Sequence, residues 1–182
     1  MPRLEPLDLK NLSPEQQAVA DAIVAGPRGG LRGPFEAWLR APELAQRAQM
    51  LGEYCRFGTS LTRDMSELAI LITGKHWKAQ FEFWAHARLA REAGVDEGII
   101  EAVRTGVQPA FGSTKPAALY DFVTEYLGTN RVSAATYASV LAEFGERGVV
   151  DIIGVVGYYG LVSMTLNVFE VSLPPGEPDP LS

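Results

Sequence analysis

A long apolar segment in the C-terminal half limits what this chain can fold into more than any other feature. Residues 149–169 are almost entirely apolar and are long enough to cross a membrane as a helix. Asp151 and Asn167 interrupt the segment. Glycines follow one another at spacings of three within it: Gly154, Gly157 and Gly160. Because 47% of all residues are hydrophobic and 21% are charged, as in ordinary globular proteins, the segment is interpreted as a buried helix of a bundle or a subunit contact rather than a membrane span.

Local signals predict helices along the rest of the chain. Ser13, Pro14 and Gln16 form the pattern of a capped helix start, in which serine and glutamine exchange hydrogen bonds with the backbone. No stretch alternates as a strand does, and no Asn-Gly or Asp-Gly hairpin turn occurs. We therefore expect an all-α fold of seven or eight helices. The expected ranges are 14–25, 42–57, a helix around 67–72, 77–93, 96–106, 115–127, 133–144 and 148–169.

The chain length of 182 residues predicts a single compact core. Residues 26–34, GPRGGLRGP, are too rich in glycine and proline for a helix, and they match neither a phosphate-binding loop nor a dinucleotide turn. This loop is interpreted either as a flexible connector or as a lid that brings Arg28 or Arg32 to an anionic ligand. The expected parts are an N-terminal helix and loop, a helical domain and an extended, mobile tail: residues 1–34, 35–171 and 172–182.

Charge and cysteine content exclude several functions. The net charge is −6 and no run of lysine and arginine occurs, so neither nucleic acid nor a membrane is expected as a partner. Cys55 is the sole cysteine, which excludes an internal disulfide, a CxxC pair and a thiolate zinc cluster. It shares an apolar helix face with Leu44, Ala48 and Leu51, so it is predicted to be a core residue. The polar start of the chain does not resemble a secretory signal, and a cytoplasmic location is expected.

Glu82 and His86 are the residues whose spacing points to chemistry. Four residues apart on a helix, they share one face and lie within side-chain reach. A carboxylate beside an imidazole favours its protonated form and makes the histidine a positioned general acid or base. Glu67 lies 19 residues before His86 in an apolar helix, where burying a carboxylate is costly without a partner. From spacing alone, Glu82 and His86 fit an ordinary helix surface equally well.

His76 adjoins a predicted helix junction and is interpreted either as a surface or capping residue or as a pocket residue. Together with Glu82 and His86 it could form a two-histidine, one-carboxylate metal site. The two histidines are ten positions apart, which is not a usual ligand spacing, so we predict no metal. Four aromatic residues are candidates for a pocket wall or for the core: Phe35, Trp84, Tyr158 and Tyr159.

Residues 67–94, ELAILITGKHWKAQFEFWAHARLAREAG, resemble the core of the carboxymuconolactone decarboxylase family, which includes the alkylhydroperoxidase D-like proteins. The following VDEGIIEAV and the second half of the chain, through SMTLNVFEV, are also similar to this family, so the resemblance covers most of residues 40–171. It implies an alkylhydroperoxidase D-like helical bundle and a homo-oligomer, commonly a trimer or hexamer.

The redox branch of this family carries a glutamate, a CxxC pair and a histidine four residues after the second cysteine. Glu67 and His86 keep the glutamate-to-histidine separation, but Ala79 and Glu82 occupy the two cysteine positions. A thiol–disulfide cycle needs an attacking and a resolving sulfur. Disulfide-based peroxidase activity is therefore not expected.

The decarboxylase branch carries a tryptophan-glutamate pair and a histidine four residues after that glutamate; here Phe81 and Glu82 form the pair. That branch decarboxylates an anionic lactone from aromatic-ring catabolism without a metal or organic cofactor. The resemblance implies that His86 reprotonates the enolate left by carbon dioxide and that Glu82 orients it, with Glu67 as a third catalytic candidate. The substrate-binding candidates are Arg28, Arg32, His76, Trp84 and Tyr158. We expect a cofactor-independent carboxy-lyase acting on a small anionic lactone or ring-cleavage product, with a redox protein or a non-catalytic binding scaffold as alternatives.

Overall fold

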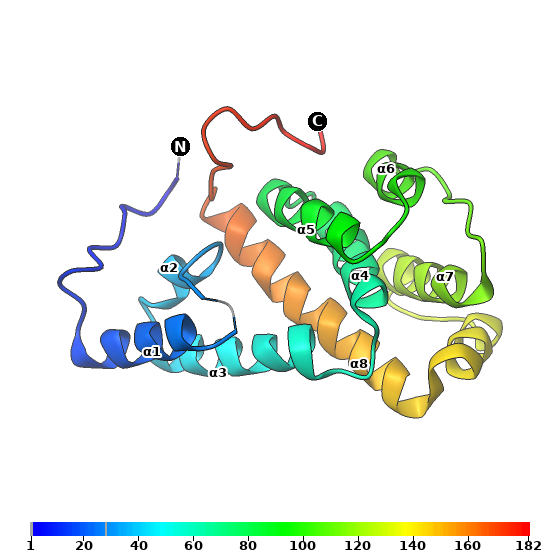
Figure 1. Ribbon diagram of the computed structural model, residues 1–182, viewed down its shortest axis with the longest axis horizontal. Helices are drawn as coiled ribbons and strands as arrows, with labels where there is room; N and C mark the ends of the chain where they lie inside the picture. Colours follow the sequence, from blue (N-terminus) through cyan, green and yellow to red (C-terminus); the bar gives the residue numbers. More distant parts are fainter. Residues whose placement is uncertain (1, 28) are drawn as a thin grey trace.

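The computed structural model describes residues 2–27 and 29–182, and within them every regular element is helical (Figure 1). The helices are α1 (Pro14–Ala25), α2 (Phe35–Trp38), α3 (Pro42–Glu53), α4 (Arg63–His76), α5 (Gln80–Glu92), α6 (Glu97–Thr105), α7 (Thr114–Thr129) and α8 (Ala134–Val168). A π-helical turn, η1 (Tyr54–Gly58), continues α3. The predicted all-α fold of seven or eight helices is confirmed.

The long helix α8 is the centre of the molecule. It crosses the body diagonally and contacts α3, α4, α5, α7 and η1 (Figure 1). Within the described residues it is the one helix long and apolar enough to span a membrane, and 67% of its most apolar window is buried inside the protein. This extent of burial agrees with the interpretation of the segment as a buried helix of a bundle.

Gly145 divides α8 into two segments. Its φ of 65° and ψ of 173° lie outside the helical region and are accessible to glycine at little cost. The sequence predicts two helices here, over residues 133–144 and 148–169, and the break falls between them. Ser133 caps the first segment by accepting a hydrogen bond from the Thr136 N–H.

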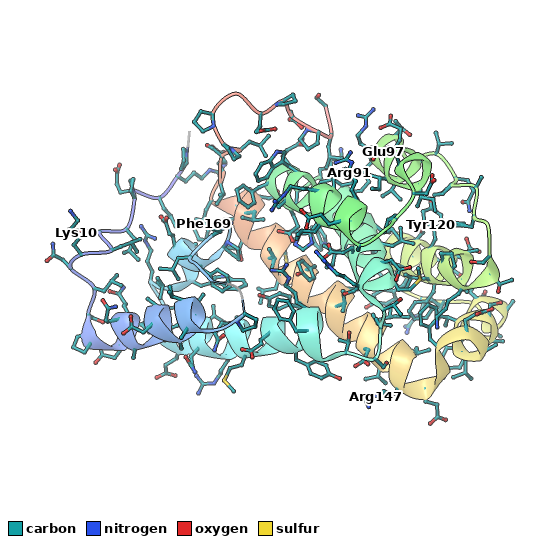
Figure 2. The ribbon with its side chains drawn as sticks, in the orientation of Figure 1. Lys10, Arg91, Glu97, Tyr120, Arg147 and Phe169 are labelled. Carbon is teal, nitrogen blue, oxygen red and sulfur yellow. The ribbon has the colours of Figure 1, made fainter. Side chains whose placement is uncertain are left out.

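Local capping signals predict several helix ends correctly. Ser13 and Gln16 form the reciprocal capping box of α1, and Asp96 caps α6 by accepting from the Gly98 N–H. The predicted start of α5 at residue 77 is wrong by three residues, because α4 continues to His76 and Lys78 adopts a left-handed φ of 51° before α5 begins at Gln80. Arg91 of α5 and Glu97 of α6, both labelled in Figure 2, form an ion pair with Nε 2.6 Å from Oε2, which holds the corner between the two helices.

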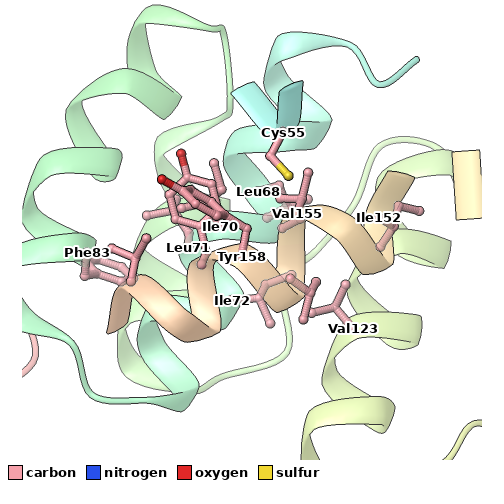
Figure 3. Close-up of a cluster of buried hydrophobic side chains, with 14 of the residues drawn as sticks. Cys55, Leu68, Ile70, Leu71, Ile72, Phe83, Val123, Ile152, Val155 and Tyr158 are labelled. Carbon is pink, nitrogen blue, oxygen red and sulfur yellow. The ribbon is translucent and has the colours of Figure 1, made fainter. Parts of the chain in front are cut away.

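The apolar core lies where η1, α4 and α5 pack on α8 (Figure 3). Cys55 is fully buried there, and a Cβ placed on Gly154 of α8 would lie 3.9 Å from its sulfur. The prediction that Cys55 is a core residue is therefore confirmed. This packing fixes the positions of α4 and α5, which carry the residues of chemical interest.

Both terminal segments lie against the helical body. The N-terminal segment is tied to the end of α8 by the Arg3 N–H, which donates to the Phe169 carbonyl at 3.0 Å. In the tail, the Trp84 indole donates to Glu177 at 2.9 Å and the Leu181 N–H donates to Gln80 at 3.0 Å. The mobility expected of residues 172–182 stays a prediction, but their position beside α5 is defined.

Candidate active site

His86 lies between two carboxylates that come from different directions. Its Nδ1 is 2.6 Å from Oε2 of Glu67 on α4, and its Nε2 is 3.0 Å from Oε1 of Glu82 one turn earlier on α5. The exposed fractions of Glu67, Glu82 and His86 are only 5%, 4% and 6%. The structure thus brings together the three residues singled out in the sequence, and it excludes the alternative that Glu82 and His86 lie on an exposed helix surface.

The two carboxylates determine the protonation of the imidazole. Burial alone would lower the pKa of His86, but the charge of Glu82 and the hydrogen bond to Glu67 outweigh it and raise the pKa to about 9. His86 is therefore an imidazolium at neutral pH. Glu67 accepts the Nδ1–H, which fixes the ring and leaves the Nε2–H on the side of Glu82.

Glu82 is less completely satisfied than Glu67. Its Oε1 is within ion-pair distance of His86 Nε2, but no hydrogen bond of acceptable geometry reaches this buried oxygen from the described residues. A buried carboxylate oxygen without an aligned donor is costly in an apolar interior. Such an oxygen is suited to accept a proton or a hydrogen bond from a bound molecule.

A cavity of about 260 Å³ opens beside this pair. Glu82 and His86 contribute to its wall, whereas Glu67 does not. Basic and aromatic side chains supply much of the remaining wall: Arg32, Arg56, Arg88, Phe35, Phe81, Trp84, Tyr158 and Tyr159. Arg88 also pairs with Glu92 at 3.6 Å, which leaves Arg32 and Arg56 as the cations of the wall without a carboxylate partner among the described ion pairs. The cavity is therefore suited to a small organic anion.

The π-helical turn η1 carries Arg56 to the cavity wall. Asp151 of α8 tethers this turn at its start and two residues beyond its end: it accepts hydrogen bonds from the Tyr54 hydroxyl at 2.6 Å and from the N–H and hydroxyl of Ser60, each at 2.7 Å. Asp151 is 3% exposed, so it is a buried anchor and not a surface charge. π-Helical turns occur frequently at functional sites because they redirect one side chain.

The other predicted substrate-binding residues have different outcomes. Arg32, Trp84 and Tyr158 line the cavity, whereas Arg28 lies outside the described residues. The structure does not bring His76 to the cavity, because α4 ends there and its exposed ring packs edge-on against Trp77. The alternative of a metal site formed by His76, Glu82 and His86 is therefore not assembled. No group of three His, Cys, Asp or Glu residues in the described part of the chain is arranged to hold a metal ion.

Sequence reasoning missed Arg56 and Arg88. A regular helical pattern through residues 42–57 misplaces Arg56, because the π-turn changes the angle between successive side chains. Arg88 follows His86 by two residues on α5, a spacing that does not predict a shared face. The one available signal for Arg56 was an arginine beside the apolar face that holds Cys55.

Comparison with known proteins supports the fold. No protein-family model and no curated protein matches the sequence. Among solved structures, the chain is similar to an uncharacterized peroxidase-related protein from Silicibacter sp. TM1040, with a TM-score of 0.77 over 96% of this chain and 92% of that chain. The sequences are 14% identical, so the likeness concerns the three-dimensional arrangement alone. It agrees with the alkylhydroperoxidase-like helical bundle that the sequence resemblance implies.

Proposed function

We propose that this chain is a cofactor-independent enzyme that transfers a proton on a small organic anion. The specific reaction proposed is decarboxylation of an anionic lactone or a related ring-cleavage product of aromatic compounds. The observation that carries the proposal is the imidazolium of His86, held between Glu67 and Glu82 at the wall of an arginine-lined cavity. An acid that stays protonated at neutral pH beside an anion-binding wall is the arrangement that protonation of an enolate requires.

The reaction would proceed in two steps. The arginines bind the substrate anion, its C–C bond to the carboxylate breaks, and carbon dioxide leaves while the electron pair passes into an extended enolate. His86 then donates its Nε2 proton to the substrate carbon and regains a proton from water. Glu67 keeps the ring oriented through Nδ1, and Glu82 stabilises the protonated ring until the transfer.

A disulfide-based peroxidase is the second function considered, and the positions of sulfur argue against it. Cys55 is buried in the core and is not part of the cavity wall. Glu82 and Ala79 stand where the family's redox branch carries its two cysteines. A thiol cycle therefore has neither an attacking nor a resolving sulfur at this site.

The proposal is tested by offering the protein a panel of small carboxylated lactones and unsaturated ring-cleavage acids. Carbon dioxide release and deuterium uptake from heavy water at the substrate carbon are measured separately. His86→Gln should lower turnover by about 10²- to 10⁴-fold, the usual contribution of a general acid. His76→Gln is the matched control, because this second histidine lies outside the cavity, and it should retain full activity.

Circular dichroism shows whether the His86 variant keeps its fold, and Glu82→Gln provides a second, more conservative test. Full turnover in a folded His86→Gln protein would contradict the proposal. Binding of these acids without carbon dioxide release or deuterium uptake would favour a non-catalytic scaffold instead. Peroxide consumption with a stoichiometric reductant would restore the redox alternative.

A further inference from the structure

A second hollow adjoins the catalytic cavity. It has a volume of about 530 Å³ and lies between the N-terminal segment, residues 31–40 and the segment that follows α8. The two spaces share four wall residues: Arg32, Gly33, Phe81 and Trp84. The two spaces are therefore neighbours that meet at these residues, and the second space is named the groove.

The groove offers mainly apolar surface. Its own wall includes Leu4, Leu31, Ala37, Phe169, Val171 and Pro174. Arg40 is the cation found in the groove but not in the catalytic cavity, and its guanidinium is already engaged with the backbone carbonyls of Glu36 and Glu5. The wall also includes the exposed residues Glu5 and Glu36, so the groove suits a hydrocarbon or aryl group and not a second anion.

Specific contacts hold the walls of the groove in place. The Arg3 guanidinium pairs with Glu170 at 2.7 Å and donates to the Val168 carbonyl at 3.1 Å, which joins the N-terminal segment to the end of α8. The Trp84 indole donates to Glu177 of the tail at 2.9 Å. A groove with walls already positioned loses less entropy on binding than one that must be ordered by its ligand.

We propose that the groove is a second substrate subsite, which takes the apolar part of the molecule whose anionic head lies at His86 and the arginines. The inference rests on the proposed function and narrows its substrate class to amphipathic organic acids with an alkyl or aryl extension. Arg32 lies where the two spaces meet and would bind the anionic head of the substrate. Phe81 and Trp84 would contact the first part of its apolar extension. The proposed occupant is the substrate itself, because the groove and the catalytic cavity share wall residues and so adjoin each other.

The test measures binding, so it does not depend on turnover. Straight-chain carboxylates from acetate to octanoate are titrated calorimetrically, and alkylammonium ions of the same lengths serve as head-group controls. Carboxylate affinity should rise about two- to fourfold for each added methylene, as partial to full burial of each methylene predicts. The ammonium series should bind at least tenfold more weakly, because the arginines repel its head.

Ala37→Trp fills the groove without touching the catalytic cavity. It should weaken octanoate binding at least tenfold and leave acetate binding within twofold. Ala22→Trp, at an exposed position of α1, is the matched control and should change neither affinity. Should Ala37→Trp fail to fold, Ser172→Trp at the exposed rim of the groove makes the same test.

The outcomes separate the two proposals. If octanoate binds no more tightly than acetate, or if both groove-filling variants keep the dependence on chain length, the subsite is overturned. If the chain-length dependence and its loss in Ala37→Trp are observed but no acid is turned over, the subsite stands and the proposed reaction fails. Equal binding of ammonium and carboxylate ions would show detergent-like adsorption and would also overturn the subsite.

Discussion

At the scale of single residues, the protonation of His86 depends on carboxylates from two helices. The chain has two histidines, and His76 is exposed, so both imidazoles can be followed separately by NMR. We expect the His86 signal to titrate near pH 9. Glu67→Gln removes a negative charge and the Nδ1 hydrogen-bond acceptor, so it should lower this pKa by at least one unit.

Glu146→Gln, a change at an exposed carboxylate of α8, is the control for the general effect of charge. It should leave the His86 titration unchanged. An unaltered titration in the Glu67 variant would mean that the contact seen in the structure does not govern the proton.

The same pKa predicts how stability depends on pH. Since folding raises the pKa of His86 from 6.5 to about 9, the protonated ring stabilises the fold fully below pH 6.5. This stabilisation is lost as the pH rises through about 9. We expect urea denaturation to show a decrease of about 3 kcal/mol in unfolding free energy between pH 6 and 10 from this group. Glu67→Gln should reduce the decrease, and an equal decrease in both proteins would assign it to other groups.

At the scale of elements, the buried carboxylate of Asp151 holds η1 in its π-helical form. Burial opposes its ionisation, but hydrogen bonds from Tyr54 and Ser60 dominate and lower the pKa of Asp151 below 3.8. The clamp is therefore present above pH 3.8 and is lost as the pH falls through the lowered pKa. Asp151→Asn should destabilise the protein by about 2 kcal/mol, because charged hydrogen bonds are replaced by weaker ones.

Hydrogen exchange gives the local readout for this variant. Amides of residues 54–60 should exchange faster in Asp151→Asn, and the affinity for small carboxylates should fall as Arg56 loses its fixed position. Asp121→Asn, at an exposed site of α7, should do neither. Unchanged exchange in residues 54–60 would show that packing alone maintains the turn.

Two glycines of α8 should respond in opposite ways when each is replaced by alanine. Gly145 has a φ of 65°, so Gly145→Ala should destabilise the protein by about 1 kcal/mol. Gly157 is exposed in regular helix, and a Cβ there meets no atom within 4 Å, so Gly157→Ala should stabilise it by about 0.5–1 kcal/mol. Thermal unfolding of the two variants measures the difference, and shifts of the same sign would contradict it.

At the scale of the whole molecule, the sequence resemblance implies a homo-oligomer, and the isolated chain offers a surface that fits one. Apolar side chains lie exposed on α3, η1 and α8: Met50, Leu51, Tyr54, Phe57, Val150 and Ile153. We predict a trimer or hexamer by light scattering, and Val150→Glu should reduce the mass because it buries a charge in the contact. Val107→Glu, at a position 61% exposed in the loop after α6 against 70% for Val150, should leave the mass unchanged. A monomeric wild-type protein would contradict the prediction.

Much of the fold could be predicted because helix ends depend on local chemistry. The capping box of Ser13 and Gln16 acts between neighbours in the sequence and was predicted, and the expected helix boundaries at residues 96 and 144–148 match the N-cap of α6 and the break in α8. The left-handed turn at Lys78 and the π-turn after α3 were not predicted, since both depend on how distant helices pack.

In the candidate site too, residues related by local spacing could be predicted and residues placed by packing could not. Glu82 and His86 are related by helical periodicity, and the resemblance supplied Glu67, so the charged centre could be anticipated. The position of Arg56 and the existence of the groove could not be anticipated from the sequence. Arg56 depends on a clamp between η1 and Asp151 of α8, and the groove exists because both ends of the chain meet beside α5.

The burial of Cys55 has a practical consequence for studying the protein. Its sulfur lies in the core at 0% exposure, so reagents that modify thiols have no accessible native target in the folded chain. A cysteine introduced on the surface would therefore carry a fluorophore or spin label at one defined position. A probe attached in this way at Ser172 would report directly when a ligand enters beside it.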